Sequence, residues 1–463
     1  MTLYYNSRSN LTAHYVCKEL DMKDINFPPF VHWEVTPKCN HNCIHCYNYW
    51  RKNPIKEMGD VDCLGTSHYI ALAKKICENK PHTVVITGGE PLLVFNKIKP
   101  VLLYFLEQKV NISINSNITL LSNDVLEFVK EKNIGMFVSF PSGEKETCDF
   151  ITGVKNSLDK ILNNLDLLYQ YGVKFNLNIV ASHININQIY KTVERLKERY
   201  YLKKIYITRV GKPINATSLF DQYLLTKADI EKLQDISVKI NEEMDLDVDT
   251  GCPYTMCSIN SQKSFNLFAY KKFCTAGKTS YAVDTFGNVK ACPRDSKIYG
   301  NILSENFAEL WSAMNEWRDD TLLPKECIEC RVKRFCGGGC RVDAYPFTQE
   351  RSSMDTTALL SNLPIKYDRQ IENTEPFDEG DVFIVQPLVV VEETFGSRLS
   401  TSRGYVYSTE LLKTFLMENS IFTVRRFMES FSVTNINATN ALKRLLKNGL
   451  IIKAKQGNSY ERM

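Results

Sequence analysis

Short apolar runs alternate with helical patterns through the first half of the chain. A short apolar run bounded by turn residues predicts a strand, and apolar residues at helical spacing predict a helix. Six strand–helix units of this kind predict an α/β fold with a parallel sheet, open or curved into a partial TIM-like (β/α)6 barrel. Residues that carry chemistry lie at the carboxyl ends of such strands. The predicted strands are 31–35, 84–86, 112–114, 136–140, 175–180 and 204–208, and the predicted helices are 92–107, 122–132, 156–171 and 187–199.

The pattern changes in the second half of the chain. From about 250 to 345, short segments dense in cysteine and glycine replace the alternation. Residues 346–382 carry Pro, Ser, Thr and Asp with little periodicity, which predicts a linker. Apolar runs at 382–391 and 404–407 then precede three helix-like stretches. The predicted segments are an N-terminal extension (1–30), an α/β core (31–245), a cysteine-rich domain (246–345), the linker (346–382) and a small C-terminal domain (383–463).

Composition narrows the functional classes. Lys and Arg number 57 against 53 Asp and Glu, so the formal net charge of +4 excludes a polybasic tail or an acidic buffer as the main theme. The 15 cysteines are an odd number in a long chain, which argues against a secreted disulfide framework. The first residues lack an apolar signal core, and no apolar run reaches membrane-spanning length. We therefore expect a cytoplasmic protein without a membrane partner, whose clustered cysteines bind metal or do redox chemistry.

The first cysteine cluster has the spacing C-x3-C-x2-C and follows directly after the first predicted strand. It consists of Cys39, Cys43 and Cys46. Thiolates are the soft ligands that iron–sulfur clusters require, and three of them leave one iron open for catalysis. The alternative is a zinc site that His41 or His45 completes.

Gly88-Gly89-Glu90-Pro91 stands at the end of the next predicted strand. Two glycines allow close backbone approach to a ligand, and a carboxylate can accept from an ammonium group. In this order the two motifs resemble the radical SAM superfamily. The resemblance implies that a [4Fe–4S] cluster on the three cysteines binds S-adenosylmethionine, which reductive cleavage converts to methionine and a 5′-deoxyadenosyl radical. That radical then abstracts hydrogen from the substrate.

Further polar positions stand where the resemblance implies contacts with S-adenosylmethionine. Each alone is equally typical of a capped turn or a solvated strand end. These positions are Asn115, Asn117, Ser139 and Asn178.

The second cysteine cluster occupies the cysteine-rich domain. Its pattern is C-x12-G-x4-C followed by C-x2-C-x5-C-x3-C, with three glycines inside the last part. Two C-x2-C-like pairs alone are typical of a zinc ribbon. The full spacing resembles the SPASM extension of radical SAM maturases, which houses two auxiliary iron–sulfur clusters. The cysteines of this pattern are Cys274, Cys292, Cys327, Cys330, Cys336 and Cys340.

The resemblance also implies how these cysteines are shared. Cys274, Cys292 and Cys340 would bind the first auxiliary cluster, with Cys252 or Cys257 as the fourth ligand. The other three, Cys327, Cys330 and Cys336, would bind the second. The family usually has one more cysteine after the position of Cys340, and this chain has none. The second cluster then has an open site, a non-cysteine ligand such as Asp343, or the remaining member of the Cys252/Cys257 pair.

Four cysteines lie outside both patterns: Cys17, Cys63, Cys77 and Cys148. A free cysteine commonly behaves as a small buried hydrophobe, which we expect for Cys77 on its helix. Cys148 is expected in a loop near the active-site rim, where it would donate a hydrogen atom if the reaction were an epimerisation.

The C-terminal domain has the order of a winged helix-turn-helix. Ser408 and Thr423 are plausible N-caps, and Asn448-Gly449 is a helix stop. DNA binding, a structural cap and peptide recognition are three possible roles. The modest basic excess is weaker than expected of a DNA reader. Peptide-modifying radical SAM enzymes often carry a small winged-helix domain that adds a leader peptide as a strand, although its usual place is N-terminal.

Taken together, the sequence predicts a radical SAM/SPASM enzyme that modifies a ribosomally synthesised precursor peptide. The product would be a cross-link, a thioether or an epimer, and the reductant an external flavodoxin or ferredoxin. One alternative is a sulfatase-type formylglycine maturase, for which we identify no dedicated carboxylate base. The other is an iron–sulfur regulator that binds nucleic acid.

Overall fold

The computed structural model describes two compact units, one within Met22–Lys366 and the other within Tyr367–Met463. Each unit is described by itself. The described residues are 28–48, 64–214, 216–268, 274–330, 333–358, 376–386, 389–393, 396–401, 404–408, 410–431, 435–447 and 450–454. Cys17, Cys63 and the predicted stop at Asn448-Gly449 lie outside them.

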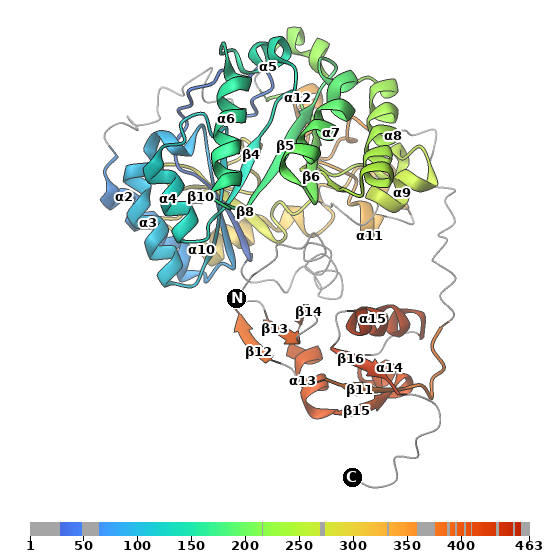
Figure 1. Cartoon of the computed structure of the whole chain (residues 1–463). Helices are drawn as coiled ribbons and strands as arrows, with labels where there is room; N and C mark the ends of the chain where they lie inside the picture. Colours follow the sequence, from blue (N-terminus) through green and yellow to red (C-terminus); the bar gives the residue numbers. More distant parts are fainter. Residues whose placement is uncertain are drawn as a thin grey trace. The chain divides into compact units, whose positions relative to one another are not determined.

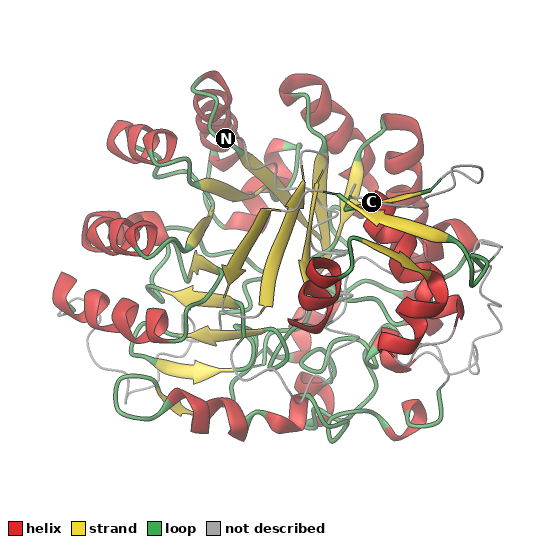
Figure 2. Cartoon of the chain, turned by 90° about the horizontal axis from the view of Figure 1, so that it is seen from below, coloured by secondary structure: helices red, strands yellow, loops and turns green. Residues whose placement is uncertain are grey.

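A ten-stranded sheet forms the centre of the larger unit, and its strands from β1 to β7 are parallel neighbours in chain order. Figure 2 shows them in an arc, with helices along its outer side. This arrangement confirms the predicted α/β partial barrel. The strands are β1 (Phe30–Glu34), β2 (Thr83–Thr87), β3 (Asn111–Ser116), β4 (Gly135–Ser139), β5 (Phe175–Ala181), β6 (Lys204–Arg209) and β7 (Asp247–Asp249).

Helices connect these strands and cover the sheet (Figure 1). Their apolar faces pack on strand residues such as Val31 and Trp33, both fully buried. The Trp33 ring meets Tyr69 of α2 and Phe105 of α3 at centroid distances of 6.1 and 5.9 Å. The helices are α2 (Thr66–Glu78), α3 (Phe95–Glu107), α4 (Asn123–Glu131), α5 (Lys145–Thr152), α6 (Ser157–Gln170), α7 (Ile189–Tyr200) and α8 (Lys227–Met244).

The cysteine-rich segment continues the same sheet. Strand β8 (Ser280–Val283) pairs in parallel with β1, so residues far apart in sequence lie beside the first strand. Strands β9 (Asn288–Lys290) and β10 (Gly300–Asn301) follow in antiparallel order. The remaining helices of this unit are short: α9 (Gln262–Phe268), α10 (Phe307–Ala313), α11 (Lys333–Cys336) and α12 (Tyr345–Thr348).

Two local expectations are corrected. Residues 145–152 form helix α5 rather than a loop, and Gly153 ends it in the left-handed conformation at φ 68°. The described part of the predicted linker, 346–358, packs against the cysteine-rich segment. Asp355 is buried there, because its carboxylate pairs with a buried arginine. Within this polar segment Asp355 and Thr357 are buried, whereas residues 347–350 are exposed.

The smaller unit has two three-stranded sheets and three helices, and its aromatic core lies among the helices and the sheet β15–β11–β16. Phe383, Phe415, Phe422 and Phe427 pack in it with Leu442. Thr423 caps α14 as predicted, since its Oγ1 accepts from Arg426 N at 3.1 Å. Ser408 instead ends a strand. The elements are β11 (Val382–Val385), β12 (Val389–Glu393), β13 (Gly396–Thr401), β14 (Gly404–Ser408), α13 (Glu410–Glu418), β15 (Ile421–Thr423), α14 (Val424–Phe431), α15 (Asn435–Lys447) and β16 (Ile451–Lys453).

Within the described part of the chain, no helix combines the length and the apolar character needed to cross a membrane.

Candidate active site and cysteine groups

The first cysteine loop leaves the carboxyl end of β1 and is anchored on helix α5. Asn42 N donates to Thr152 O at 2.8 Å, and Ile44 N donates to Ile151 O at 2.9 Å. Gly153 lies directly against Asn42, where an added Cβ would make close contact. The end of α5 and Gly153 therefore hold the cysteine loop in place.

The turn at Gly88 and Gly89 packs against the residues that precede Cys39. Gly89 N donates to Thr36 O at 2.5 Å, and Glu90 N donates to Lys38 O at 2.8 Å. Gly88 has φ 140°, and a Cβ on Gly89 would overlap the Lys38 carbonyl. The glycines thus allow a close approach by the chain's own backbone, which holds the two predicted motifs side by side.

Glu90 links the ends of β2 and β3. Its buried carboxylate accepts from Leu92 N at 3.0 Å, from Ser116 Oγ at 2.7 Å and from Asn117 N at 2.8 Å. Burial raises the pKa of Glu90, and these hydrogen bonds oppose the rise. The described partners of Glu90 are protein donors, so acceptance from an ammonium group stays a prediction.

Asn117 connects the end of β3 to the cysteine loop. Its Nδ2 donates to Asn40 Oδ1 at 2.9 Å and lies 3.8 Å from Cys39 Sγ. Thr119 reinforces the link, because its Oγ1 accepts from Asn40 Nδ2 at 2.8 Å. The structure therefore brings Cys39, Glu90 and Asn117 together at one edge of the sheet.

The other predicted contacts lie on this side of the neighbouring strands. Ser139 ends β4 and is paired in register with Asn178 of β5. Asn178 Oδ1 accepts from Thr208 Oγ1 of β6 at 2.7 Å. Asn115 lies half-buried on β3. Their contacts with S-adenosylmethionine stay predictions.

The two histidines of this loop differ in their surroundings. His41 Nε2 lies 3.4 Å from Thr119 Oγ1. Burial lowers the pKa of His45 to about 4, which keeps its imidazole neutral, the form that can bind a metal, so this shift does not exclude zinc. Among the described residues, no three His, Cys, Asp or Glu side chains are gathered closely enough to hold a single metal ion. Cysteines on a cubane bind different irons and need not converge on one point, so the donor set fits an iron–sulfur cluster.

Four cysteines of the cysteine-rich domain, three from the second cluster and Cys252, form a group at Arg294. Arg294 Nη1 lies 3.5 Å from Cys252 Sγ and 3.7 Å from Cys340 Sγ, and Arg294 N donates to Cys292 Sγ at 3.4 Å. Burial raises the pKa of Cys292 to about 12, and the neighbouring Cys274 thiolate adds to the rise. We call Cys252, Cys274, Cys292 and Cys340 the Arg294 group.

Cys336 and three further cysteines form another group in the same domain. Met256 N donates to Cys336 Sγ at 3.4 Å, and Cys257 is the next residue in the 3-10 helix Met256–Ser258. Burial raises the pKa of Cys327 to about 12, with further contributions from the thiolates of Cys336, Cys330 and Cys257. We call Cys257, Cys327, Cys330 and Cys336 the Cys336 group.

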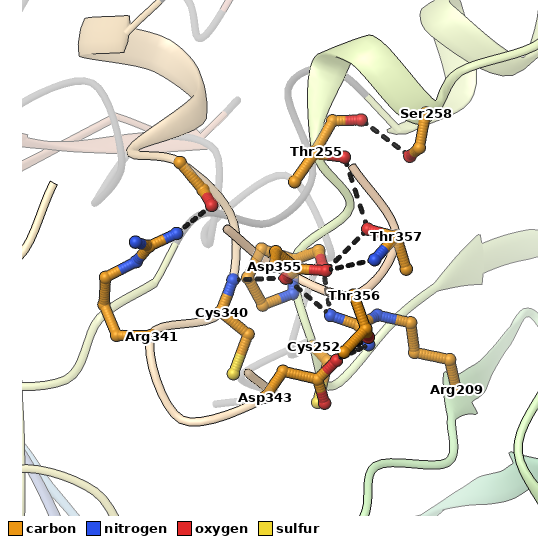
Figure 3. Close-up of polar contacts among 12 residues, drawn as sticks. Arg209, Cys252, Thr255, Ser258, Cys340, Arg341, Asp343, Asp355, Thr356 and Thr357 are labelled. Carbon is orange, nitrogen blue, oxygen red and sulfur yellow. Dashed lines mark hydrogen bonds and ion pairs between the residues drawn. The ribbon is translucent and has the colours of Figure 1, made fainter. Parts of the chain in front are cut away.

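A buried ion cluster beside the Arg294 group was missed by sequence reasoning. Arg209, at the end of β6, donates to Asp343 Oδ2 at 2.6 Å and to Asp355 Oδ2 at 2.7 Å (Figure 3). Burial alone would raise the pKa of Asp343, but Arg209 and Arg294 lower it to about 2. An isolated arginine in a sequence does not show whether it is buried or which carboxylates it pairs with. The one available hint was the position of Arg294, two residues after Cys292.

The described cysteines outside these sets are structural in character. Cys148 is fully buried in α5, with its Sγ 3.3 Å from Ser157 Oγ, so the expected loop position at the active-site rim is wrong. Cys77 lies on α2 as predicted and is partly buried. None of the described cysteines forms a disulfide.

Comparison with known proteins gives the same picture. Residues 33–196 match the Radical SAM superfamily model. The AdoMet-dependent heme synthase of Methanosarcina barkeri is 25% identical over 345 residues, which cover 70% of this chain and 94% of that protein. Mycofactocin maturase MftC of Mycolicibacterium smegmatis is 23% identical over 333 residues, 69% of this chain and 79% of that protein.

A solved structure has the same fold. Streptococcus suis SuiB bound to precursor peptide SuiA superimposes with a TM-score of 0.57 at 16% identity, covering 76% of this chain and 79% of SuiB. The likeness to SuiB shows the fold alone, and the family match makes residues 33–196 a radical SAM domain, a class whose cofactors are S-adenosylmethionine and a [4Fe–4S] cluster.

Proposed function

We propose that this enzyme modifies a ribosomally synthesised precursor peptide, giving a cross-link, a thioether or an epimer. The observation that carries the proposal is the pairing of one three-cysteine loop, beside the Gly88–Glu90 turn, with two separate groups of four cysteines. A catalytic cluster next to auxiliary clusters is the arrangement that the SPASM resemblance associates with peptide and protein maturases.

In the catalytic site, Cys39, Cys43 and Cys46 would hold the [4Fe–4S] cluster, and the Gly88–Glu90 turn would face the bound S-adenosylmethionine. When bound and reduced, these cofactors supply a radical able to remove hydrogen from an unactivated carbon. The protein's part is to orient the cysteines. Asn117 positions Cys39, Glu90 fixes the ends of β2 and β3, and α5 anchors the loop between the cysteines.

Auxiliary clusters and an external reductant complete the proposed machinery. The Arg294 and Cys336 groups offer eight thiols, most of them buried, and soft buried thiolates suit iron–sulfur clusters. Electrons would come from a flavodoxin or ferredoxin.

The peptide substrate is supported by two features. SuiB, which shares the fold, is known in complex with a precursor peptide. In the smaller unit, β12 and β14 each have one strand partner among the described residues. An edge strand can pair with an added peptide strand through its unused backbone groups. We therefore propose leader-peptide binding as the role of the smaller unit.

The test is mass spectrometry of candidate peptides, namely the short peptides encoded beside the gene. Each is incubated anaerobically with the reconstituted enzyme, S-adenosylmethionine and reductant. The expected result is loss of two hydrogens for a cross-link or thioether, or deuterium incorporation from D2O for an epimer. The Cys43→Ala variant should leave the same peptide unchanged. Production of 5′-deoxyadenosine with no change in any candidate peptide would contradict the peptide assignment.

Heme formation is the second candidate, because a heme synthase matches 70% of this chain. The same assay with an iron-porphyrin precursor in place of the peptide separates the two. Conversion of the porphyrin with no peptide modified would favour heme formation.

A further inference from the structure

The second auxiliary cluster lacks one ligand in the sequence pattern. Cys327, Cys330 and Cys336 supply three thiolates, and no cysteine follows Cys340. An open iron there would offer a place for a substrate thiolate. The identity of the fourth ligand therefore decides whether this cluster can bind substrate.

The nearby carboxylates are already committed to other partners. Asp343 is bonded through Oδ2 to Arg209 and through Oδ1 to Arg294 at 3.2 Å, and Thr356 donates to it as well. Asp355 accepts from Arg209 at 2.7 Å and from Cys340 N at 2.6 Å through one oxygen. Its other oxygen accepts from Thr357 N at 2.8 Å and from the Thr357 hydroxyl at 2.7 Å. Ligation of iron by either carboxylate would break a buried ion pair.

The two upstream cysteines lie in different groups. The Cys252 sulfur is 3.5 Å from the same Arg294 Nη1 that lies 3.7 Å from the Cys340 sulfur. Four residues, Pro253 to Met256, separate Cys257 from Cys252, and the Met256 amide hydrogen-bonds the Cys336 sulfur at 3.4 Å. Cys252 and Cys257 are both buried, as ligands of enclosed clusters are.

We propose that Cys257 is the fourth ligand of the second auxiliary cluster, with Cys327, Cys330 and Cys336, while Cys252 completes the first with Cys274, Cys292 and Cys340. Both auxiliary clusters are then closed by four thiolates, and neither has an iron open to a substrate thiolate. The assignment deepens the proposed function and rests on its iron–sulfur part, not on the peptide.

The test uses the full-length chain with Cys39, Cys43 and Cys46 replaced by alanine, so that only auxiliary clusters remain. Cys257→Ala, Cys336→Ala, Cys252→Ala and Cys340→Ala are each added to this background. Iron and sulfide are counted after anaerobic reconstitution, and EPR spectra are recorded after reduction. We expect Cys257→Ala to alter the same EPR signal as Cys336→Ala, and Cys252→Ala to alter the same signal as Cys340→Ala.

Cys148→Ala is the matched control, because Cys148 is a buried thiol outside both groups. A Cys257→Ala spectrum identical to that of this control would overturn the assignment, as would loss of the signal that depends on Cys340. If Cys257→Ala does not fold, Cys257→Asp keeps an oxygen ligand, and we expect it to retain iron with a shifted second-cluster signal. An unshifted signal would overturn the assignment. Failure to modify a peptide leaves these spectra unaffected and concerns the proposed function alone.

Discussion

At the scale of single residues, the position of the first cysteine loop depends on two glycines as much as on the Glu90 carboxylate. Gly88 and Gly89 let the turn after β2 touch the backbone of Thr36 and Lys38. Glu90 then uses its carboxylate to hold three donors from two strand ends. Gly88, Gly89 and Glu90 therefore fix the backbone that leads to Cys39, apart from any role in cofactor binding.

Gly89→Ala should displace the cysteine loop, because its Cβ would overlap the Lys38 carbonyl. Overpacking against backbone typically costs about 1–3 kcal/mol or more, and the expected result is a lower unfolding midpoint with incomplete iron loading of the first cluster. Gly135→Ala is the control, since an added Cβ there meets nothing within 4 Å. Equal iron loading in the two variants would contradict the packing role.

Cys148 provides a prediction about pH. Burial raises the pKa of Cys148 from 9.0 to about 11, so its thiolate fraction at pH 8 is roughly a hundredfold below that of an exposed cysteine. Because the folded-state pKa lies above the unfolded value, its contribution to stability is complete below about pH 9 and is lost as pH rises toward 11. Mass-mapped alkylation of the native protein should place the midpoint for Cys148 near 11. A midpoint near that of an unfolded peptide would contradict its burial.

At the scale of elements, ionic contacts bind the cysteine-rich segment to the core. Arg209 ends β6, whereas Asp343 and Asp355 lie more than a hundred residues later in the chain. All three side chains are almost completely buried, so each charge depends on the others for compensation. The same segment provides Cys340 to the Arg294 group. The ion cluster thus couples the position of a predicted cluster ligand to a core strand.

Arg209→Met should destabilise the larger unit by about 3–5 kcal/mol, because it leaves two buried carboxylates without their shared cation. Arg195→Met is the control, since Arg195 pairs with Glu144 at the surface and such pairs contribute about 0–1 kcal/mol. Denaturant unfolding followed by circular dichroism measures the difference. Similar midpoints for the two variants would show that the buried ion cluster is dispensable.

Arg294→Gln should lower the reduction potential of the first auxiliary cluster. The guanidinium lies 3.5 and 3.7 Å from two sulfurs of the Arg294 group and stabilises the more negative, reduced state. A hydrogen bond to a charged group is worth about 1.5–3 kcal/mol, which corresponds to roughly 60–130 mV for a one-electron couple. EPR-monitored redox titration measures the shift, with Arg195→Gln as control. An unchanged or raised potential would contradict this role.

At the scale of the whole molecule, periodicity predicted the six parallel strands and their order to within a few residues. It succeeded because each strand places apolar residues at its buried positions, with alternation of buried and less buried residues in β3 and β5. It missed helix α5, where Glu146, Thr147 and Asp149 obscure the apolar face. The pairing of β8 with β1 could not be predicted either, because the sequence of a four-residue strand does not indicate which strand 250 residues away pairs with it.

The candidate site could be predicted in its residue types but not in its contacts. Spacing predicted that Cys39, Cys43 and Cys46 share one loop, since their local sequence alone brings three thiols together, and their role as cluster ligands stays a prediction. The roles of Arg209, Arg294 and Asp355 depend on long-range contacts and left no pattern in the sequence. The assignment of Cys252 and Cys257 to different cysteine groups likewise depends on the conformation of the four residues between them.

The central claim is that the loop of Cys39, Cys43 and Cys46 makes this chain a radical SAM enzyme. The most direct test is anaerobic reconstitution and reduction in the presence of S-adenosylmethionine, followed by chromatographic measurement of 5′-deoxyadenosine. The account predicts that the wild-type chain and the Cys148→Ala variant form 5′-deoxyadenosine and methionine, and that Cys43→Ala forms neither. Production by Cys43→Ala at the wild-type rate would contradict the assignment of the catalytic site.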